Sequence, residues 1–223
     1  MSRLHFLTRL ALVTPLLAMS LQAFADSSIT EEYLAGRNEA RQSRERKIYA
    51  QSLREKAKAT LTQADFVYAE GVRLRERNAM SEMELLNAHM ALLQASMAYR
   101  RTVYIEEHES LDERIWQLRS AWIVGSKSRS LKDLAKIYVE IRQKYVAFSE
   151  GLLSDMTMMA RDRQESYEMK GKLVKTHAIS LEDFNEASVF NQQAKEELKI
   201  TNAQLTNARA ALAEALDDLE KAD

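Results

Sequence analysis

Two groups of side chains in this sequence are of types that bind metal ions. Glu106, Glu107, His108 and Glu109 are consecutive and offer carboxylate and imidazole ligands. A second group offers thioethers, which suit Cu(I). It consists of Met156, Met158, Met159 and Met169. Consecutive charged residues are typical of a solvated helix face, and methionines commonly fill irregular cores. We favour these simpler interpretations and expect no metal or other cofactor.

No catalytic motif accompanies these groups. Beyond residue 25 the sequence has three histidines, His89, His108 and His177, and it has no cysteine. The HExxH, GxSxG and phosphate-binding loop motifs do not occur in it. The 32 Lys and Arg nearly balance the 33 Asp and Glu, whereas a nucleic-acid-binding protein would need a basic face. We therefore expect a protein that is not an enzyme and has no nucleic acid partner.

The first 25 residues have the pattern of a secretory signal peptide. Arg3 and Arg9 precede the apolar run LALVTPLLAMSL, and Ala23-Phe24-Ala25 gives an A-x-A cleavage site. The run is shorter than a membrane-spanning helix requires, and no later segment is apolar enough to cross a bilayer. We expect cleavage after Ala25 and export to the periplasm of a Gram-negative bacterium. An uncleaved membrane anchor is the alternative.

Residues 26–223 have the composition of long helices. The only proline, Pro15, lies in the predicted signal peptide, and glycine occurs five times in the chain, although turns rely on both residues. Small or apolar residues recur every seven positions, as in helices that pack closely in pairs. Near the C-terminus the leucine row is Leu198, Leu205, Leu212 and Leu219, and the small-residue row is Ala187, Ala194, Thr201, Ala208, Ala215 and Ala222. An upstream small-residue row is Ala50, Ala57, Ala64 and Gly71.

Few breaks interrupt this pattern. A serine followed three residues later by an acidic residue marks a helix start at Ser81, Ser130 and Ser180. Ser28 or Thr30 could cap the first helix. The sequence therefore predicts helices at about 30–76, 82–123, 131–176 and 181–222, each roughly 60–70 Å long.

The predicted fold class is all-α, with a single domain over 26–223. It consists of two elongated antiparallel helical hairpins, at about 30–123 and 131–222, that form a coiled-coil-like four-helix bundle. The loop between them is predicted at 125–130, where the sequence reads GSKSRS.

Two stretches repeat each other at a spacing of 99 residues: NAMSEMELLNAHMALLQA from 78 and HAISLEDFNEASVFNQQA from 177. The matching pairs are Ala79 and Ala178, Ser81 and Ser180, Ala88 and Ala187, and Ala95 and Ala194, with Leu74 and Leu173 upstream. We interpret each stretch as a chain reversal. Asn78 and His177 stand where a left-handed residue ends a helix, and each serine caps the next helix. An unbroken helix through each serine is the alternative.

Residues 78–115, which begin NAMSEMELL, and residues 176–216, which begin THAISLEDF, resemble the helical repeat of TolC-like outer-membrane efflux factors. They are equally similar to the hairpin of periplasmic adaptor (membrane fusion) proteins, whose tip carries Arg, Leu and Ser. Leu74 with Ser81, and Leu173 with Ser180, match that Leu and Ser. The Arg position is occupied here by Glu70 and Met169. The similarity covers most of 50–122 and 150–222, and the β-structure of both families has no counterpart in the sequence.

The resemblance implies a periplasmic component of an efflux or secretion assembly, associated with the outer membrane. Its partners would be an adaptor or channel component, or further copies of itself, docked through the hairpin tips. The predicted contact residues are Leu74, Asn78, Ala79, Met80, Ser81, Leu173, His177, Ala178, Ile179 and Ser180. We expect Met80 and Ile179 to be exposed there. If these residues make only turns and caps, the alternative is a free-standing periplasmic scaffold or holdase chaperone.

Overall fold

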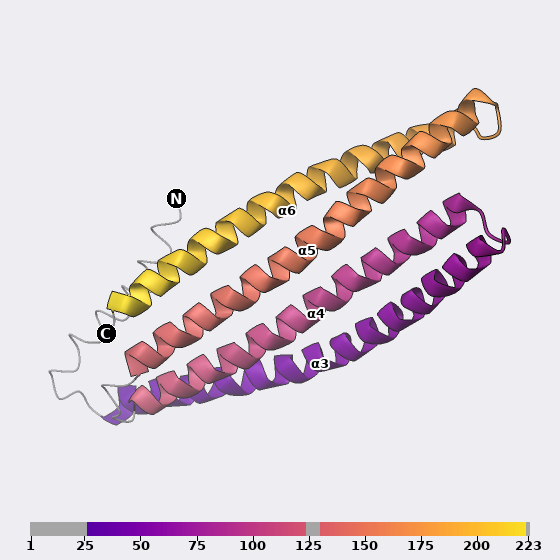
Figure 1. Cartoon of the computed structure of the whole chain (residues 1–223). Coiled ribbons are helices and arrows are strands. Elements are labelled where there is room, and N and C mark those ends of the chain that lie inside the picture. Colours follow the sequence, from indigo (N-terminus) through magenta and orange to yellow (C-terminus); the bar gives the residue numbers. More distant parts are fainter. Residues whose placement is uncertain (1–25, 124–129, 222–223) are drawn as a thin grey trace.

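The computed structural model describes residues 26–123 and 130–221, and it leaves the side chains of 26–34, 36 and 121–130 undescribed. The described residues form four helices, α3 (Asp26–Glu76), α4 (Glu82–Ile123), α5 (Ser130–Lys175) and α6 (Leu181–Lys221), and contain no strand (Figure 1). The predicted all-α fold with four long helices is confirmed. The predicted signal peptide at 1–25 and most of the predicted loop at 125–130 lie outside the described residues.

The helix boundaries agree with the prediction to within one residue, except at the start of α3. The predicted cap at Ser28 or Thr30 is wrong, because α3 is already helical at Asp26 and both residues lie inside it. Alanine and straight-chain residues dominate all four helices, and these lose little conformational freedom in a helix. No proline occurs within them.

The four helices pack in chain order as two antiparallel hairpins. Helix α3 packs on α4, α5 packs on α6, and the hairpins meet through α4 and α5, which share the smallest of the three interfaces. Among the described residues, α3 and α6 do not contact each other. The bundle is therefore open, with α3 and α6 as its outer helices and both reversals at one end (Figure 1).

Small residues let the helices of each hairpin approach closely. In α6, the predicted row of Ala187, Ala194, Thr201, Ala208 and Ala215 is buried throughout, as is Leu205. The other leucines of the predicted leucine row, Leu198, Leu212 and Leu219, are half-buried. In α3, Ala50 and Gly71 are buried and Ala57 and Ala64 are half-buried. The predicted heptad rows are therefore the packing surfaces of the hairpins, and the small row lies deeper than the leucine row.

Larger apolar residues fill the contact between the hairpins. One cluster contains Leu86, Met90, Leu93 and Met159. A second contains Leu111, Ile115 and Ile137. Both clusters combine residues of α4 with residues of α5, so the two hairpins share a hydrophobic core.

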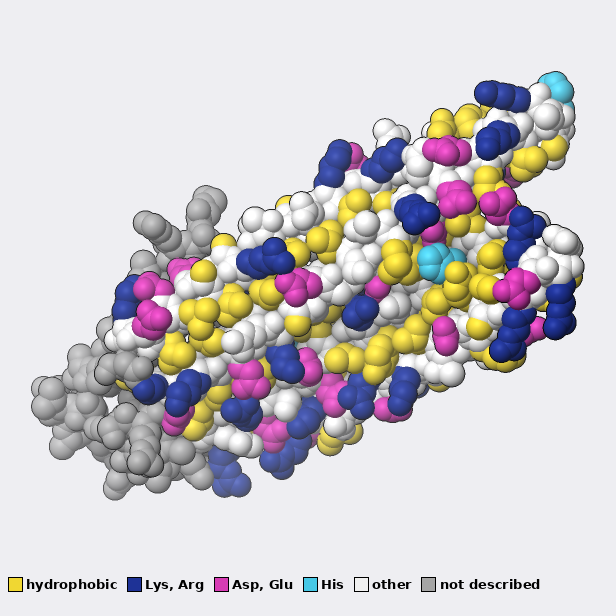
Figure 2. Space-filling model, viewed as in Figure 1, with side chains coloured by type: hydrophobic (Ala, Val, Ile, Leu, Met, Phe, Trp, Pro, Cys, Tyr) yellow, Lys and Arg dark blue, Asp and Glu magenta, His cyan; other side chains and the backbone are white. Residues whose placement is uncertain are grey.

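The described part of the visible face mixes charged and hydrophobic side chains along its length (Figure 2). Within the described ranges, no helix combines the length and the apolar character that a membrane crossing requires.

Candidate functional site

The reversal between α3 and α4 begins with a Schellman motif. The backbone N–H of Ala79 donates to the carbonyl of Leu74 at 2.8 Å, and the N–H of Asn78 donates to the carbonyl of Arg75 at 2.9 Å. Asn78 is left-handed, with φ of 55°. These bonds satisfy carbonyls that the end of α3 would otherwise leave without partners.

The same reversal ends in a capping box that starts α4. The N–H of Glu84 donates to Ser81 Oγ at 3.2 Å, and the N–H of Ser81 donates to the Glu84 carboxylate at 2.8 Å. Hydrogen bonds from the Ser81 side chain and backbone lower the pKa of Glu84 below its ordinary value. The predicted helix start at Ser81 is confirmed.

The reversal between α5 and α6 is built in the same way. His177 has φ of 57°, and the N–H groups of His177 and Ala178 donate to the carbonyls of Val174 and Leu173 at 3.1 and 3.0 Å. The N–H of Asp183 donates to Ser180 Oγ at 3.0 Å, and the N–H of Ser180 donates to the Asp183 carboxylate at 3.3 Å. Both reversals are therefore confirmed. Their conformation explains the sequence repeat, and the unbroken-helix alternative is wrong.

Most of the predicted contact residues are accessible at this end of the molecule. The exposed ones are Asn78, Ala79, Ser81, Leu173, His177, Ala178 and Ser180. The half-buried ones are Leu74, Met80 and Ile179. Because both reversals lie at the same end (Figure 1), one partner surface could contact both sets.

The expectation that Met80 and Ile179 are exposed is wrong. A Cβ atom at Gly71 would lie 3.1 Å from Met80 Sδ and 3.2 Å from Leu85 Cδ1, so Met80 and Leu85 fill the space above the glycine. This is the hydrophobic staple, in which the residue before a helix cap packs near the fourth helical residue. Met80 therefore fixes the path of the chain as well as contributing to the surface.

The interface between α4 and α5 contains a buried carboxylate that the sequence analysis did not single out. Asp155 has a side chain only 5% exposed, and it accepts hydrogen bonds from Arg100 Nε at 2.8 Å and Ser96 Oγ at 2.9 Å. A Cβ atom at Gly151 would lie 2.6 Å from Arg100 Nη1. Glycine at this position therefore leaves the space through which Arg100 reaches Asp155.

A second buried carboxylate lies nearer the reversals. Asp162 Oδ2 is 2.6 Å from His89 Nδ1, and the Tyr68 ring lies against the His89 ring with their centroids 4.8 Å apart. These residues come from α5, α4 and α3, so the contact links three helices. Burial raises the pKa of Asp162, and the neighbouring His89 and Arg161 partly oppose that rise.

We expect Asp162→Asn to be tolerated better at neutral pH than at acidic pH. Because the folded-state pKa of Asp162 is raised, the folded chain holds this proton more tightly than the unfolded chain. Its contribution to stability is therefore lost as the pH rises through the window above its ordinary pKa. Asparagine does not titrate. The difference in Tm, variant minus wild type, should increase between about pH 3 and pH 7.

Asp183→Asn is the matched control, with the opposite sign. Hydrogen bonds from Ser180 lower the pKa of Asp183, so its contribution is present at neutral pH and is lost as the pH falls through the folded-state pKa. The difference in Tm for Asp183→Asn should decrease over the same range. The same slope for both variants would show that the Asp162 environment is misassigned.

The two candidate metal groups have other roles in the structure. Glu106, Glu107 and Glu109 pair with Arg54, Lys144 and Arg46 at 2.8, 3.0 and 2.9 Å. His108 Nδ1 is 3.5 Å from Asp112. Met156 and Met159 are buried, Met169 packs against the core and Met158 is partly exposed. In the ranges that the structure describes, no three His, Asp or Glu side chains are arranged to hold a metal ion.

No protein family, curated protein or solved structure matches this chain.

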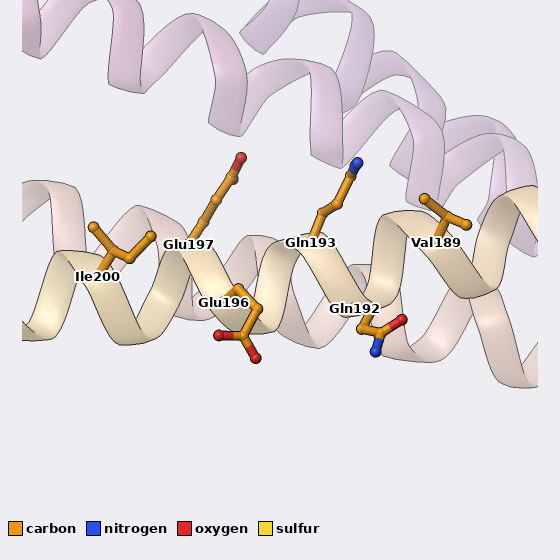
Figure 3. A pocket seen from close by; sticks show the side chains of 6 residues that line it. All are labelled: Val189, Gln192, Gln193, Glu196, Glu197 and Ile200. Carbon is orange, nitrogen blue, oxygen red and sulfur yellow. The ribbon is translucent and has the colours of Figure 1, made fainter.

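A shallow hollow lies along α6, and it has little of the enclosure typical of a small-molecule site. Its described lining comes from α6 alone: Val189, Gln192, Gln193, Glu196, Glu197 and Ile200 (Figure 3). Val189, Gln193 and Glu197 project from one side of the helix, whereas Gln192 and Glu196 project from another (Figure 3). The polar groups therefore do not converge on a ligand, and the reversals remain the better candidate site.

The buried carboxylates could have been predicted from the sequence only if the register between α4 and α5 had been known. Asp155 and Asp162 are seven residues apart in α5, and their partners Ser96 and His89 are seven residues apart in α4. In antiparallel helices that spacing brings both pairs together. Charged residues at core positions of a heptad were the available signal.

Proposed function

We propose that this protein is a periplasmic, TolC-like helical component of an efflux or secretion assembly, and that it docks on a partner protein through its two reversals. One observation carries the proposal. Two reversals of the same construction lie at the same end of the molecule, and each presents a short exposed segment. Long hairpins place these segments far from the opposite end of the bundle.

The chemistry of the reversals supports docking on a protein. Ala79 and Ala178 are small and exposed, and each follows a residue held in the left-handed conformation. Their backbones are fixed by hydrogen bonds on both sides, so docking would require little further ordering of the chain. The similarity of residues 78–115 and 176–216 to TolC-like factors and adaptor hairpins agrees with this role.

Site-specific photo-cross-linking tests the proposal. A photoreactive amino acid at Ala79 or at Ala178 is expected to give a discrete adduct with one partner protein in intact cells. The same amino acid at Ala203, an exposed alanine in the middle of α6, is the matched control and is expected to give no such adduct. Ala79→Glu with Ala178→Glu should reduce co-purification of the partner at least about tenfold, because docking would desolvate the new carboxylates.

Circular dichroism should show wild-type helicity for the double glutamate variant, since both alanines are exposed. Adducts that form equally well at Ala203, or that never include a second protein, would contradict docking through the reversals. That result would favour the free-standing scaffold or holdase.

A further inference from the structure

Helices α3 and α6 are the free edges of the open bundle, and they carry most of its exposed large apolar side chains. Of the thirteen such side chains that the described residues expose, nine belong to these two helices. Ile48 and Phe66 on α3, and Val189 and Ile200 on α6, are each more than half exposed. The apolar surface that the bundle leaves uncovered is therefore concentrated at its two edges.

Each edge repeats a second row of residues on the helix face opposite the buried row. In α3 the row is Ile48, Ser52, Glu55, Ala59, Thr62 and Phe66. In α6 it is Val189, Gln193, Glu196, Ile200, Ala203 and Asn207. Every member is exposed, and each row contains one charged residue. The spacing alternates between four and three residues, as on the packed face of a helix, whereas a solvated face is mostly charged or polar.

Contacts across the bundle fix which parts of the two edges lie at the same level. The Tyr68 ring of α3 lies against the His89 ring of α4, and His89 contacts Asp162 of α5. The next residue, Arg163, lies over the Phe190 ring of α6, 4.9 Å from its centroid. Tyr68 and Phe190 are therefore nearly level. Because α3 and α6 run in opposite directions (Figure 1), residues before Tyr68 lie level with residues after Phe190.

The shapes of the two edges are complementary at this level. Phe66 projects from α3 and is 63% exposed. The shallow hollow of α6 extends from Val189 to Ile200, which is the stretch level with Phe66. Packed helices interlock when a side chain of one helix fills a hole between residues of the other. One edge therefore offers a large side chain where the other edge offers a hollow.

The charges of the two edges are also complementary at this level. Asp65 on α3 and Lys195 on α6 are exposed and lie level within one helical turn. Neither forms an ion pair with another described residue. No residue of opposite charge lies three or four positions from either of them in the sequence, so their own helices do not compensate these charges.

These surfaces cannot meet within one chain, because α3 and α6 share no contact among the described residues. We propose that a second copy of this chain covers each edge, with α3 of one copy packed on α6 of the next. Phe66 then fills the hollow of the neighbouring α6, and Asp65 pairs with the neighbouring Lys195. Residues that are level in one copy meet without a shift along the bundle, and a contact between two different edges closes into a ring only without such a shift.

This contact goes beyond the proposed function. It runs along the sides of the outer helices and leaves the reversals free, whereas the predicted docking residues all lie at the reversals. A ring of this kind would place the reversals of all its copies at one end.

Disulfide trapping tests the contact, because the chain contains no cysteine of its own. Mild oxidation of the purified Phe66→Cys, Gln193→Cys double variant is expected to give covalent oligomers. Phe66→Cys with Asn207→Cys is the matched control. Position 207 belongs to the same row of α6 but lies about 21 Å further along the helix, so this variant should stay monomeric on a denaturing gel. Each single-cysteine variant should also stay monomeric.

Sedimentation equilibrium of the purified protein measures the association without a cross-link. Asp65→Lys is expected to weaken it severalfold, and adding Lys195→Asp should restore it. Ile200→Glu should weaken it at least about tenfold, because the contact would desolvate the new carboxylate. Ile105→Glu is the control, since Ile105 is exposed on α4 and lies outside both edges. It should associate as the wild type does. Circular dichroism should show unchanged helicity, because all four positions are exposed.

Three results would overturn the proposal. The first is a wild-type protein that stays monomeric at every concentration. The second is cross-linking that is equally strong in the Asn207→Cys control or in the single-cysteine variants. The third is a charge exchange at positions 65 and 195 that fails to restore the association. No other protein is present in these experiments, so their failure is distinguishable from failure of docking through the reversals.

Discussion

Arg100→Met is expected to lower the free energy of unfolding by about 3 kcal/mol. The substitution leaves the Asp155 carboxylate, whose side chain is 5% exposed, with Ser96 as its remaining side-chain partner. A buried charge without its counter-ion must be hydrated by opening the interface or must take up a proton, and both cost stability. Urea unfolding followed by circular dichroism measures the loss.

Two further variants make this result specific. Arg101→Met is the matched control, because Arg101 is the next residue and is exposed like Arg100, whereas the contact with Asp155 belongs to Arg100. It should change stability by less than about 0.5 kcal/mol. Arg100→Met with Asp155→Leu should recover most of the loss, since it also removes the buried carboxylate that the single substitution leaves without its ion-pair partner. Equal effects of Arg100→Met and Arg101→Met would show that the Asp155 contact does not stabilise the interface.

Leu205→Asp is expected to destabilise the protein by about 3–5 kcal/mol and to loosen the second hairpin. Leu205 is 5% exposed, in the region where α6 packs on α5. The substitution removes a buried leucine and also places a carboxylate at a buried position, where it loses its hydration. Leu212 belongs to the same heptad row and is half-buried, so Leu212→Asp should cost less.

The exposed position Leu216 supplies the control for this series. It is 42% exposed, and Leu216→Asp should leave the melting temperature close to that of the wild type. Thermal melts of the three variants should therefore follow burial, with Leu205→Asp the lowest. Equal melting temperatures for Leu205→Asp and Leu216→Asp would show that the α5–α6 packing surface is misassigned.

The fold was predictable because its determinants are local and periodic. Heptad rows such as Ala187, Ala194 and Thr201 identify the packing face of a helix without any knowledge of its neighbour. The reversals were predictable for the same reason, since Asn78, Ser81 and Glu84 interact with residues within a few positions along the chain. The sequence did not show which row lies deeper, because that depends on how closely two helices approach.

The contact between the hairpins was not predictable from such patterns. Asp155 meets Arg100 only when α4 and α5 are antiparallel in one particular register, and Gly151 matters only because Arg100 passes over it. The exposure of Met80 was misjudged for a similar reason. Met80 is half-buried because it packs over Gly71, which lies in the preceding helix and has no side chain. The residues of the turn itself do not include this glycine, so they do not indicate the space that Met80 fills.

The packing of the helices in chain order has a consequence for how the protein folds. In the described residues each helix contacts only the helices adjacent to it in the sequence. Contacts nearest a reversal, such as Gly71 with Met80, join positions only a few residues apart and so have the lowest loop-closure entropy. We expect each hairpin to nucleate at its reversal and to extend from there towards the opposite end. The clusters shared by α4 and α5 join the two hairpins, so we expect them to form last, when the hairpins pack on each other.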